Sequence, residues 1–308
     1  MTSLLRTALR GSRPLSALAG TMTVLFVVCV LGLILDDRQV GGQPVWLKPT
    51  KFALSFAIYG LTLAWLLAHL RRGRRIAQVA AGVIVVTAVL EVGIIVMQAA
   101  RGHFSHYNVL TPFDEFMWRS MGALIIVLWL ATAVVAALLW RDGLADRAGT
   151  WAVRLGMGLF LVGLLQGSFM LVPTPEQVRL DDAGLDTLKG AHAVGVPDGG
   201  PGLPLIGWST TGGDLRIGHF VGIHGLQAIL LFTMLLSLMV SDPGRRARLV
   251  VVFAGAYTGL LVLVTWQALR GQPLLAPDAI TLLAAAGLAL ATGLGAAHAW
   301  RRPVLVDG

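Results

Sequence analysis

The sequence contains little charge and almost no cysteine. Only 13% of its 308 residues are charged, whereas a soluble domain usually carries about 25%. The hydrophobic share is 56%, and several apolar runs reach roughly 20 residues, enough to cross about 30 Å of hydrocarbon. These features exclude an ordinary soluble domain and predict an all-α membrane protein. The only cysteine, Cys29, lies in an apolar run, so an intramolecular disulfide is excluded.

Acidic residues are also scarce, with 16 Asp and Glu against 24 Lys and Arg. The bases gather at the ends of apolar runs, which indicates membrane orientation rather than nucleic-acid binding. The first run is too long for the apolar part of a signal peptide, and no small-residue cleavage site follows it, so we expect a retained first helix. Eight transmembrane helices are predicted, at about 17–35, 51–70, 75–100, 118–140, 149–172, 217–240, 249–269 and 278–300.

The connections between these spans differ in charge. One set holds 15 of the 24 bases and 4 of the 16 acids, and it comprises 1–13, 71–75, 141–154, 241–248 and 301–308. The positive-inside rule then predicts that the N-terminus and the C-terminus are both cytoplasmic. We expect a multi-pass protein of a bacterial inner membrane, with the lipid bilayer as partner and no nucleic acid.

Two parts of the chain resemble each other. Residues 128–141 read LWLATAVVAALLWR, residues 288–301 read LALATGLGAAHAWR, and eight of the fourteen positions are identical. The pentapeptides at 98–102 and 267–271 give a second match. Self-similarity at a nearly fixed offset indicates a repeat architecture. We predict two four-helix repeats of parallel orientation, at 1–148 and 149–308, the second with a long outer loop at 173–216.

Glu91 is an acid inside the third predicted span, roughly 10–13 Å below its outer end. A carboxylate at such depth costs about 2.5–3.5 kcal/mol on insertion scales, and it is a functional-site hypothesis by default. Gln98 follows seven residues later and is expected on the same helix face. We predict catalytic roles for Glu91 and Gln98. The structural alternative is a protonated Glu91 that is hydrogen-bonded between helices.

Four histidines are expected near the outer membrane face. His219 and His224 open the sixth span about 140° apart on the helix, and His103 and His106 follow the third span. The hypothesis is that His224 is catalytic, and that a metal ion or haem is the cofactor. The metal ligands would then be His103, His106 and His219. Because the HxxxH spacing of helical zinc sites is absent, the alternative is a set of interfacial hydrogen-bonding groups.

Six basic residues are expected at the outer helix ends, against the positive-inside trend. They are Lys48, Lys51, Arg101, Arg119, Arg216 and Arg270. One explanation is an anionic ligand such as a lipid phosphate or a carboxylate. The other is pairing with nearby acids, namely Asp114, Glu115, Asp214 and Asp278. We assign ligand binding to Lys51, Arg101, Asp214 and Arg216.

The polar residues of the spans gather in the outer halves, and the inner halves contain no acid. This distribution predicts a polar pocket that opens outward above an apolar floor, whereas a transport path needs polar groups at the midplane. The leading hypothesis is a membrane-embedded enzyme or a metal- or haem-binding protein that takes an anionic or lipidic small molecule. The alternatives are a proton- or cation-coupled transporter and a non-catalytic subunit of a membrane complex.

Overall fold

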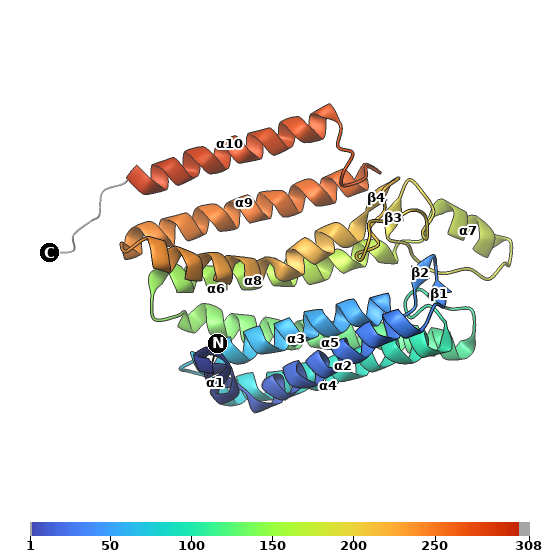
Figure 1. The fold of residues 1–308 in the computed structure, drawn as a ribbon, viewed down its shortest axis with the longest axis horizontal. Helices are drawn as coiled ribbons and strands as arrows, with labels where there is room; N and C mark the ends of the chain where they lie inside the picture. The colour runs from blue at the N-terminus through green and yellow to red at the C-terminus, as the bar shows by residue number, and fades with distance from the viewer. Residues whose placement is uncertain (1, 302–308) are drawn as a thin grey trace.

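A computed structural model describes residues 2–301, in which eight long helices lie side by side (Figure 1). All eight are long and apolar enough to cross a membrane. The chain is therefore a multi-pass helical membrane protein, and the predicted fold class is confirmed at that level. The eight helices are α2 (Arg13–Leu35), α3 (Leu47–Ala68), α4 (Arg74–Arg101), α5 (Pro112–Asp142), α6 (Arg147–Gln166), α8 (Leu215–Met239), α9 (Pro243–Leu269) and α10 (Ala279–Arg301).

Shorter elements occupy the two ends of the bundle. Helix α1 (Thr2–Gly11) lies at the end that holds the short turns, which we call the turn side (Figure 1). The opposite end, the loop side, holds every other short element. These are the paired strands β1 (Gln39–Val40) and β2 (Gln43–Pro44), the 3₁₀ helix η1 (Gly167–Leu171), helix α7 (Pro175–Asp182), and the paired strands β3 (Ala193–Val194) and β4 (Gly213–Asp214).

Capping residues, and not the ends of the apolar runs, determine where two of the helices begin. Helix α5 begins at Pro112, six residues before the predicted span, because Thr111 Oγ1 accepts the backbone N–H of Asp114 at 3.1 Å. Helix α9 begins at Pro243 in the same way, with Asp242 Oδ2 accepting the N–H of Arg245 at 2.6 Å. A capping side chain followed by proline is a favourable helix start, because proline lacks an N–H that the first turn would leave unpaired.

Glycine permits a close crossing of α6 and α8. A Cβ atom on Gly163 of α6 would lie 2.3 Å from the Gly222 carbonyl carbon of α8. A Cβ on Gly222 would lie 2.4 Å from Gly163 Cα. Small residues let backbones approach in a membrane, where lipid supplies no hydrophobic drive between helices. Gly158, by contrast, has no atom within 4 Å of its would-be Cβ and does not serve this crossing.

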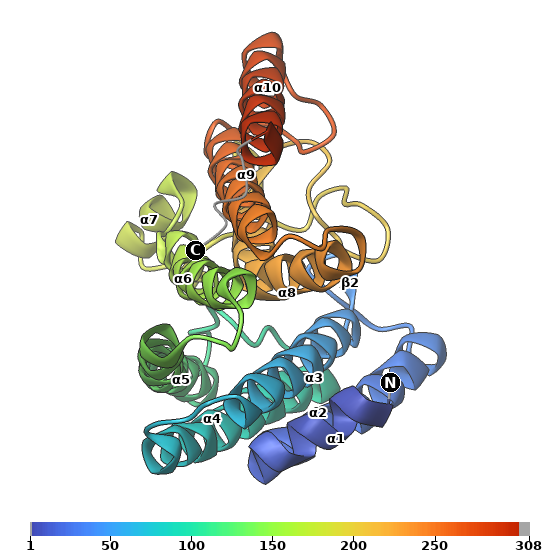
Figure 2. The ribbon, with the colours of Figure 1, turned by 90° about the vertical axis from the view of Figure 1, so that its left-hand side faces the viewer.

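The helices form a group of four, α2 to α5, and a second group that begins with α6 and α8 (Figure 2). Tyr59 of α3 stacks on Phe160 of α6 with ring centroids 4.9 Å apart, which joins the two groups. The Tyr59 hydroxyl also lies 2.6 Å from Thr132 Oγ1 of α5. Helices α9 and α10 extend away from this contact, and α10 lies against α9 alone in Figure 2.

Candidate functional site

Glu91 lies in α4, ten residues before its end at Arg101, so it is about 15 Å from the loop-side end of the helix. Glu91 is only 4% exposed, so its carboxylate is enclosed by protein and does not lie on the surface of the bundle. Its Oε2 atom has no hydrogen-bond partner within residues 2–301. Buried polar groups are almost always hydrogen-bonded, so an unpartnered buried carboxylate requires an explanation.

Lys48 is the charged group that acts on Glu91. It lies in the first turn of α3 and is half-buried. Among the described residues Lys48 makes no hydrogen bond or ion pair, although it interacts electrostatically with Lys51, Arg216 and Glu91. Lys48 and Glu91 are thus close enough to influence each other but are not in ion-pair contact.

Lys51 lies one turn further along α3, on the same face as Lys48. Its Nζ donates a hydrogen bond to the backbone oxygen of Ile206 at 3.1 Å, across 155 residues of sequence. Lys51 also interacts electrostatically with Arg216 and Asp214. The α3 lysines and the start of α8 therefore belong to one charged cluster on the loop side.

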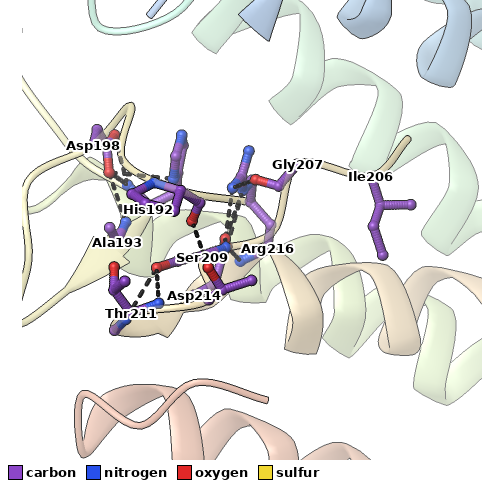
Figure 3. A network of polar contacts seen from close by, with 12 residues as sticks. His192, Ala193, Asp198, Ile206, Gly207, Ser209, Thr211, Asp214 and Arg216 are labelled. Atoms are coloured by element: carbon purple, nitrogen blue, oxygen red, sulfur yellow. Dashed lines mark hydrogen bonds and ion pairs between the residues drawn. The ribbon is translucent and has the colours of Figure 1, made fainter. Parts of the chain in front are cut away.

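Arg216 and Asp214 form a bidentate pair at the junction of β4 and α8 (Figure 3). Arg216 Nε lies 2.9 Å from Asp214 Oδ1, and Arg216 Nη2 lies 2.5 Å from Asp214 Oδ2. Asp214 is 0% exposed and also accepts the N–H of Ser209 at 2.9 Å. Burial alone would raise the pKa of Asp214, but its bonds to Arg216 hold that pKa below its usual range.

A small pocket opens beside this pair on the loop side. Arg216, His192 and Ser209 line it, together with Gln43 from β2. The carboxylate of Asp198 holds the His192 segment, since it accepts the N–H of Ala193 at 2.7 Å (Figure 3). Burial and the charge of Arg216 lower the pKa of His192 to about 4, so the ring is neutral at pH 7. The pocket therefore presents neutral polar groups next to one arginine.

Two histidines interact with the same cluster, His106 from the segment between α4 and α5 and His219 from the first turns of α8. The His106 ring contacts Phe52 of α3 and Trp118 of α5, with ring centroids 6.1 and 5.3 Å apart. Burial and the charge of Lys48 hold the pKa of His106 well below its usual range, so it is neutral at pH 7. His219 Nδ1 lies 2.7 Å from the oxygen of Gly163, a distance at which the ring donates to that carbonyl. His106 and His219 also interact electrostatically.

The other predicted histidines have different surroundings. His103 Nδ1 lies 3.4 Å from Asp114 Oδ2, and the His224 ring lies 4.4 Å from the Phe220 ring. No group of three or more His, Cys, Asp or Glu side chains within residues 2–301 is arranged to hold a metal ion. The predicted ligands His103, His106 and His219 do not form such a group, and metal binding by them stays a prediction.

Gln98 and Arg101 form a separate network with Asp114. The Gln98 amide donates to Asp114 Oδ1 at 2.8 Å, and Arg101 Nη1 donates to the same oxygen at 2.7 Å. Gln98 is 0% exposed, so its polar atoms are buried and satisfied. These bonds explain both residues by architecture, and neither has a recorded interaction with Glu91 among the described residues. The catalytic role of Gln98 and the ligand-binding role of Arg101 stay predictions.

All four arginines at the loop-side helix ends pair with an acid, as the second explanation predicted. Their distances to acids are 2.7 Å for Arg101–Asp114, 2.6 Å for Arg119–Glu115, 2.5 Å for Arg216–Asp214 and 2.6 Å for Arg270–Asp278. The two lysines remain without an acid partner in the described part of the chain. Lys48 was not among the predicted site residues, yet its position three residues before Lys51 was a sequence signal for a shared helix face.

No known protein family, no curated protein and no solved structure matches this chain. Its class is defined by its own architecture, a multi-pass membrane protein of eight apolar helices.

Proposed function

We propose that this protein is a membrane-embedded enzyme that binds a small anionic molecule on the loop side and exchanges a proton with it through Glu91. One observation carries the proposal: Glu91 is 4% exposed and its Oε2 has no hydrogen-bond partner within residues 2–301. A buried unsatisfied polar group costs about 1–3 kcal/mol. Such a cost is typical of a site that is completed by a ligand rather than by the protein.

The charge of the cluster supports an anionic ligand. Three cations, Lys48, Lys51 and Arg216, act on one another electrostatically. Asp214 already takes the bidentate face of Arg216. Among residues 2–301, Glu91 is then the carboxylate that acts on Lys48. An added anion would relieve the repulsion among the cations, and hydrogen bonds between ionised groups are stronger than those between neutral ones.

The proposed roles follow from these positions. Lys48 and Lys51 bind the anion, and Arg216 is oriented toward it by Asp214. Glu91 is the acid or base, because it is a buried carboxylate whose Oε2 has no hydrogen-bond partner within residues 2–301, whereas the carboxylate of Asp214 is bonded to Arg216. His106 contacts α3 through Phe52, and His219 contacts the α6–α8 crossing through the Gly163 oxygen, so both supply polar groups beside the cluster. His224 keeps its predicted catalytic role beside Glu91, supported by its electrostatic interaction with His219.

We also propose that the eight helices are two repeats, at 1–148 and 149–308. Two helix ends support this. Gly102 and Gly271 both have a φ of 72°, and their N–H groups bond to Ala99 and Ala268 at 3.0 and 2.9 Å. The arginine before each glycine then pairs with the acid that opens the next helix, Asp114 or Asp278. In line with the positive-inside rule, we place the turn side in the cytoplasm of a bacterial cell, so that the site faces outward.

A transporter that couples transport to protonation of Glu91 is the second candidate. An unpartnered carboxylate inside the bundle is a feature of proton-coupled transport as well. The stacked Tyr59 and Phe160 rings join the two helix groups, and transport would require this contact to open. Enzyme and transporter differ in what happens to the ligand, which is chemically changed in one case and moved intact in the other.

A ligand screen tests the proposal. Purified protein is heated with panels of small carboxylates and phosphates, since a ligand of the folded state raises the melting temperature. We expect at least one anion to stabilise the wild type and Arg119→Gln, which changes an exposed ion pair, but not Lys48→Met. Mass spectrometry of that anion after incubation then separates catalysis from binding, and uptake into sealed liposomes detects transport. Absence of any stabilising anion would contradict the proposal.

A further inference from the structure

Two of the three cations are held by one short turn of the long loop. Lys51 Nζ donates to the oxygen of Ile206 at 3.1 Å, and Arg216 Nη2 donates to the oxygen of Gly207 at 2.6 Å. Figure 3 shows Arg216 beside Gly207, with Ile206 next to it in the chain. Two consecutive carbonyl oxygens thus bridge two positively charged side chains, one from α3 and one from α8.

The turn that supplies these carbonyls, residues 203–207, has an unfavourable conformation. The N–H of Gly207 bonds to the oxygen of Leu203 at 2.7 Å, which closes the turn. Leu205 at its centre has a φ of 66°, in the left-handed region where a side chain crowds the backbone. The Leu205 residue is also 85% exposed, so the turn gains little from burying it. The rest of the molecule must hold this turn in place.

We propose that the Ile206 and Gly207 carbonyls stand in for two oxygens of an oxyanion, and that the ligand binds by displacing the 203–207 turn. The ligand class is a carboxylate or a phosphate, which offers two oxygens a short distance apart to Lys51 and Arg216. This inference rests on the proposed function. The 203–207 turn would compete with the ligand for Lys51 and Arg216. Glu91, buried and unpartnered, is the independent sign that the cluster awaits a ligand.

Lys51 and Arg216 would form stronger hydrogen bonds to the ligand than to the backbone carbonyls of the turn. A backbone carbonyl is a neutral acceptor, whereas an oxyanion forms charge-assisted hydrogen bonds that are roughly twice as strong. Displacement also releases Leu205 from its left-handed conformation. Because the turn occupies the site when the ligand is absent, the apparent affinity is lowered by the fraction of molecules in which the turn is closed. Substitutions that open the turn should therefore strengthen anion binding unless they remove a cation.

A spin label on Leu205→Cys reports the turn directly, since that side chain points outward and Cys29 is 0% exposed. The labelled protein is placed in nanodiscs of zwitterionic phosphatidylcholine. Sodium phosphate or sodium acetate is added, with sodium chloride of equal ionic strength as the reference. A second set of nanodiscs contains anionic phosphatidylglycerol without added anion. These arms distinguish a free anion from a lipid headgroup that carries the same chemistry.

We expect the label to become more mobile with phosphate, acetate or phosphatidylglycerol, but not with chloride. In Lys51→Met, which removes the bond to Ile206, the label should be mobile before any addition and should respond less. The Arg119→Gln control should behave as the wild type. An immobile label in every arm overturns the inference. If anions stabilise the protein against heat while the label stays immobile, the proposed function survives and the displaced turn does not.

Discussion

Tyr59 and Phe160 stack face to face, with their ring planes 2° apart and their centroids 4.9 Å apart. The contact brings α3, which carries Lys48 and Lys51, next to α6, whose Gly163 oxygen accepts from His219. Residues from both helix groups therefore meet at the candidate site. The site depends on this junction, so substitutions at the junction should change the stability of the folded protein.

Gly163→Ala should destabilise the protein. The added Cβ would meet the backbone of Gly222 at 2.3 Å, and neither backbone can move without separating α6 from α8. Overpacking of this kind typically costs about 1–3 kcal/mol. Gly158→Ala on the same helix is the matched control, because nothing lies within 4 Å of its would-be Cβ. Melting temperatures in detergent should fall for the first variant only, and equal values would contradict the close crossing.

Arg101→Gln should cost more stability than Arg270→Gln, although the two arginines occupy equivalent positions in the proposed repeats. The partner of Arg101, Asp114, has a fully buried side chain, whereas the side chain of Asp278 is 38% exposed. A buried acid that loses its arginine is penalised more than one that water can reach. Thermal unfolding of both variants checks the order. The reverse order would show that Asp114 does not depend on Arg101.

Acid should weaken the loop-side fold through His192. Its folded pKa of about 4 lies below the usual 6.5, since burial and the nearby Arg216 and Lys48 outweigh Asp198 and Asp214. The unfolded chain then binds more protons between these values, so stability is lost as the pH falls from about 6.5 to 4. Melting curves of wild type and His192→Gln across this range test it. A wild-type decline no steeper than that of His192→Gln would contradict it.

Reporter fusions test the proposed orientation. A reporter placed at residue 190, in the long loop, should register the outside of the cell. Fusions at 72 and at 308 should register the cytoplasm, because the turn-side connections carry most of the basic residues. A cytoplasmic signal at 190 would reverse the orientation and with it the side from which the site is reached.

The eight spans were predictable because long apolar runs with few charges fit only a membrane helix. Their boundaries were less accurate where capping decides them. The start of α5 at Pro112 is encoded by Thr111 and Pro112, a signal that lies outside the apolar run. The short helix α1 has no such run and was not predicted at all.

The hydrogen-bond partners of the candidate site residues were predictable only in part. Glu91 stands out in the sequence because a carboxylate inside an apolar run is costly. Gln98, on the same predicted face, was grouped with it, but Asp114 and Arg101 satisfy it instead. Which of two buried polar residues has partners depends on the conformation of the loop between α4 and α5, and helical periodicity does not specify that. The contact of Lys51 with Ile206 spans 155 residues and likewise has no local signal.

The central claim is that Glu91 is kept for function and contributes little to stability. Gln98→Met is the matched comparison, since Gln98 is equally enclosed, lies seven residues further along α4 and is hydrogen-bonded. Glu91→Met alone leaves Lys48 without a countercharge, so the double variant Glu91→Met/Lys48→Met is the cleaner test. We predict that the melting temperature of the purified double variant equals or exceeds that of the wild type, while Gln98→Met lowers it. A double variant that melts as low as Gln98→Met would show that Glu91 and Lys48 are structural, and would contradict the account.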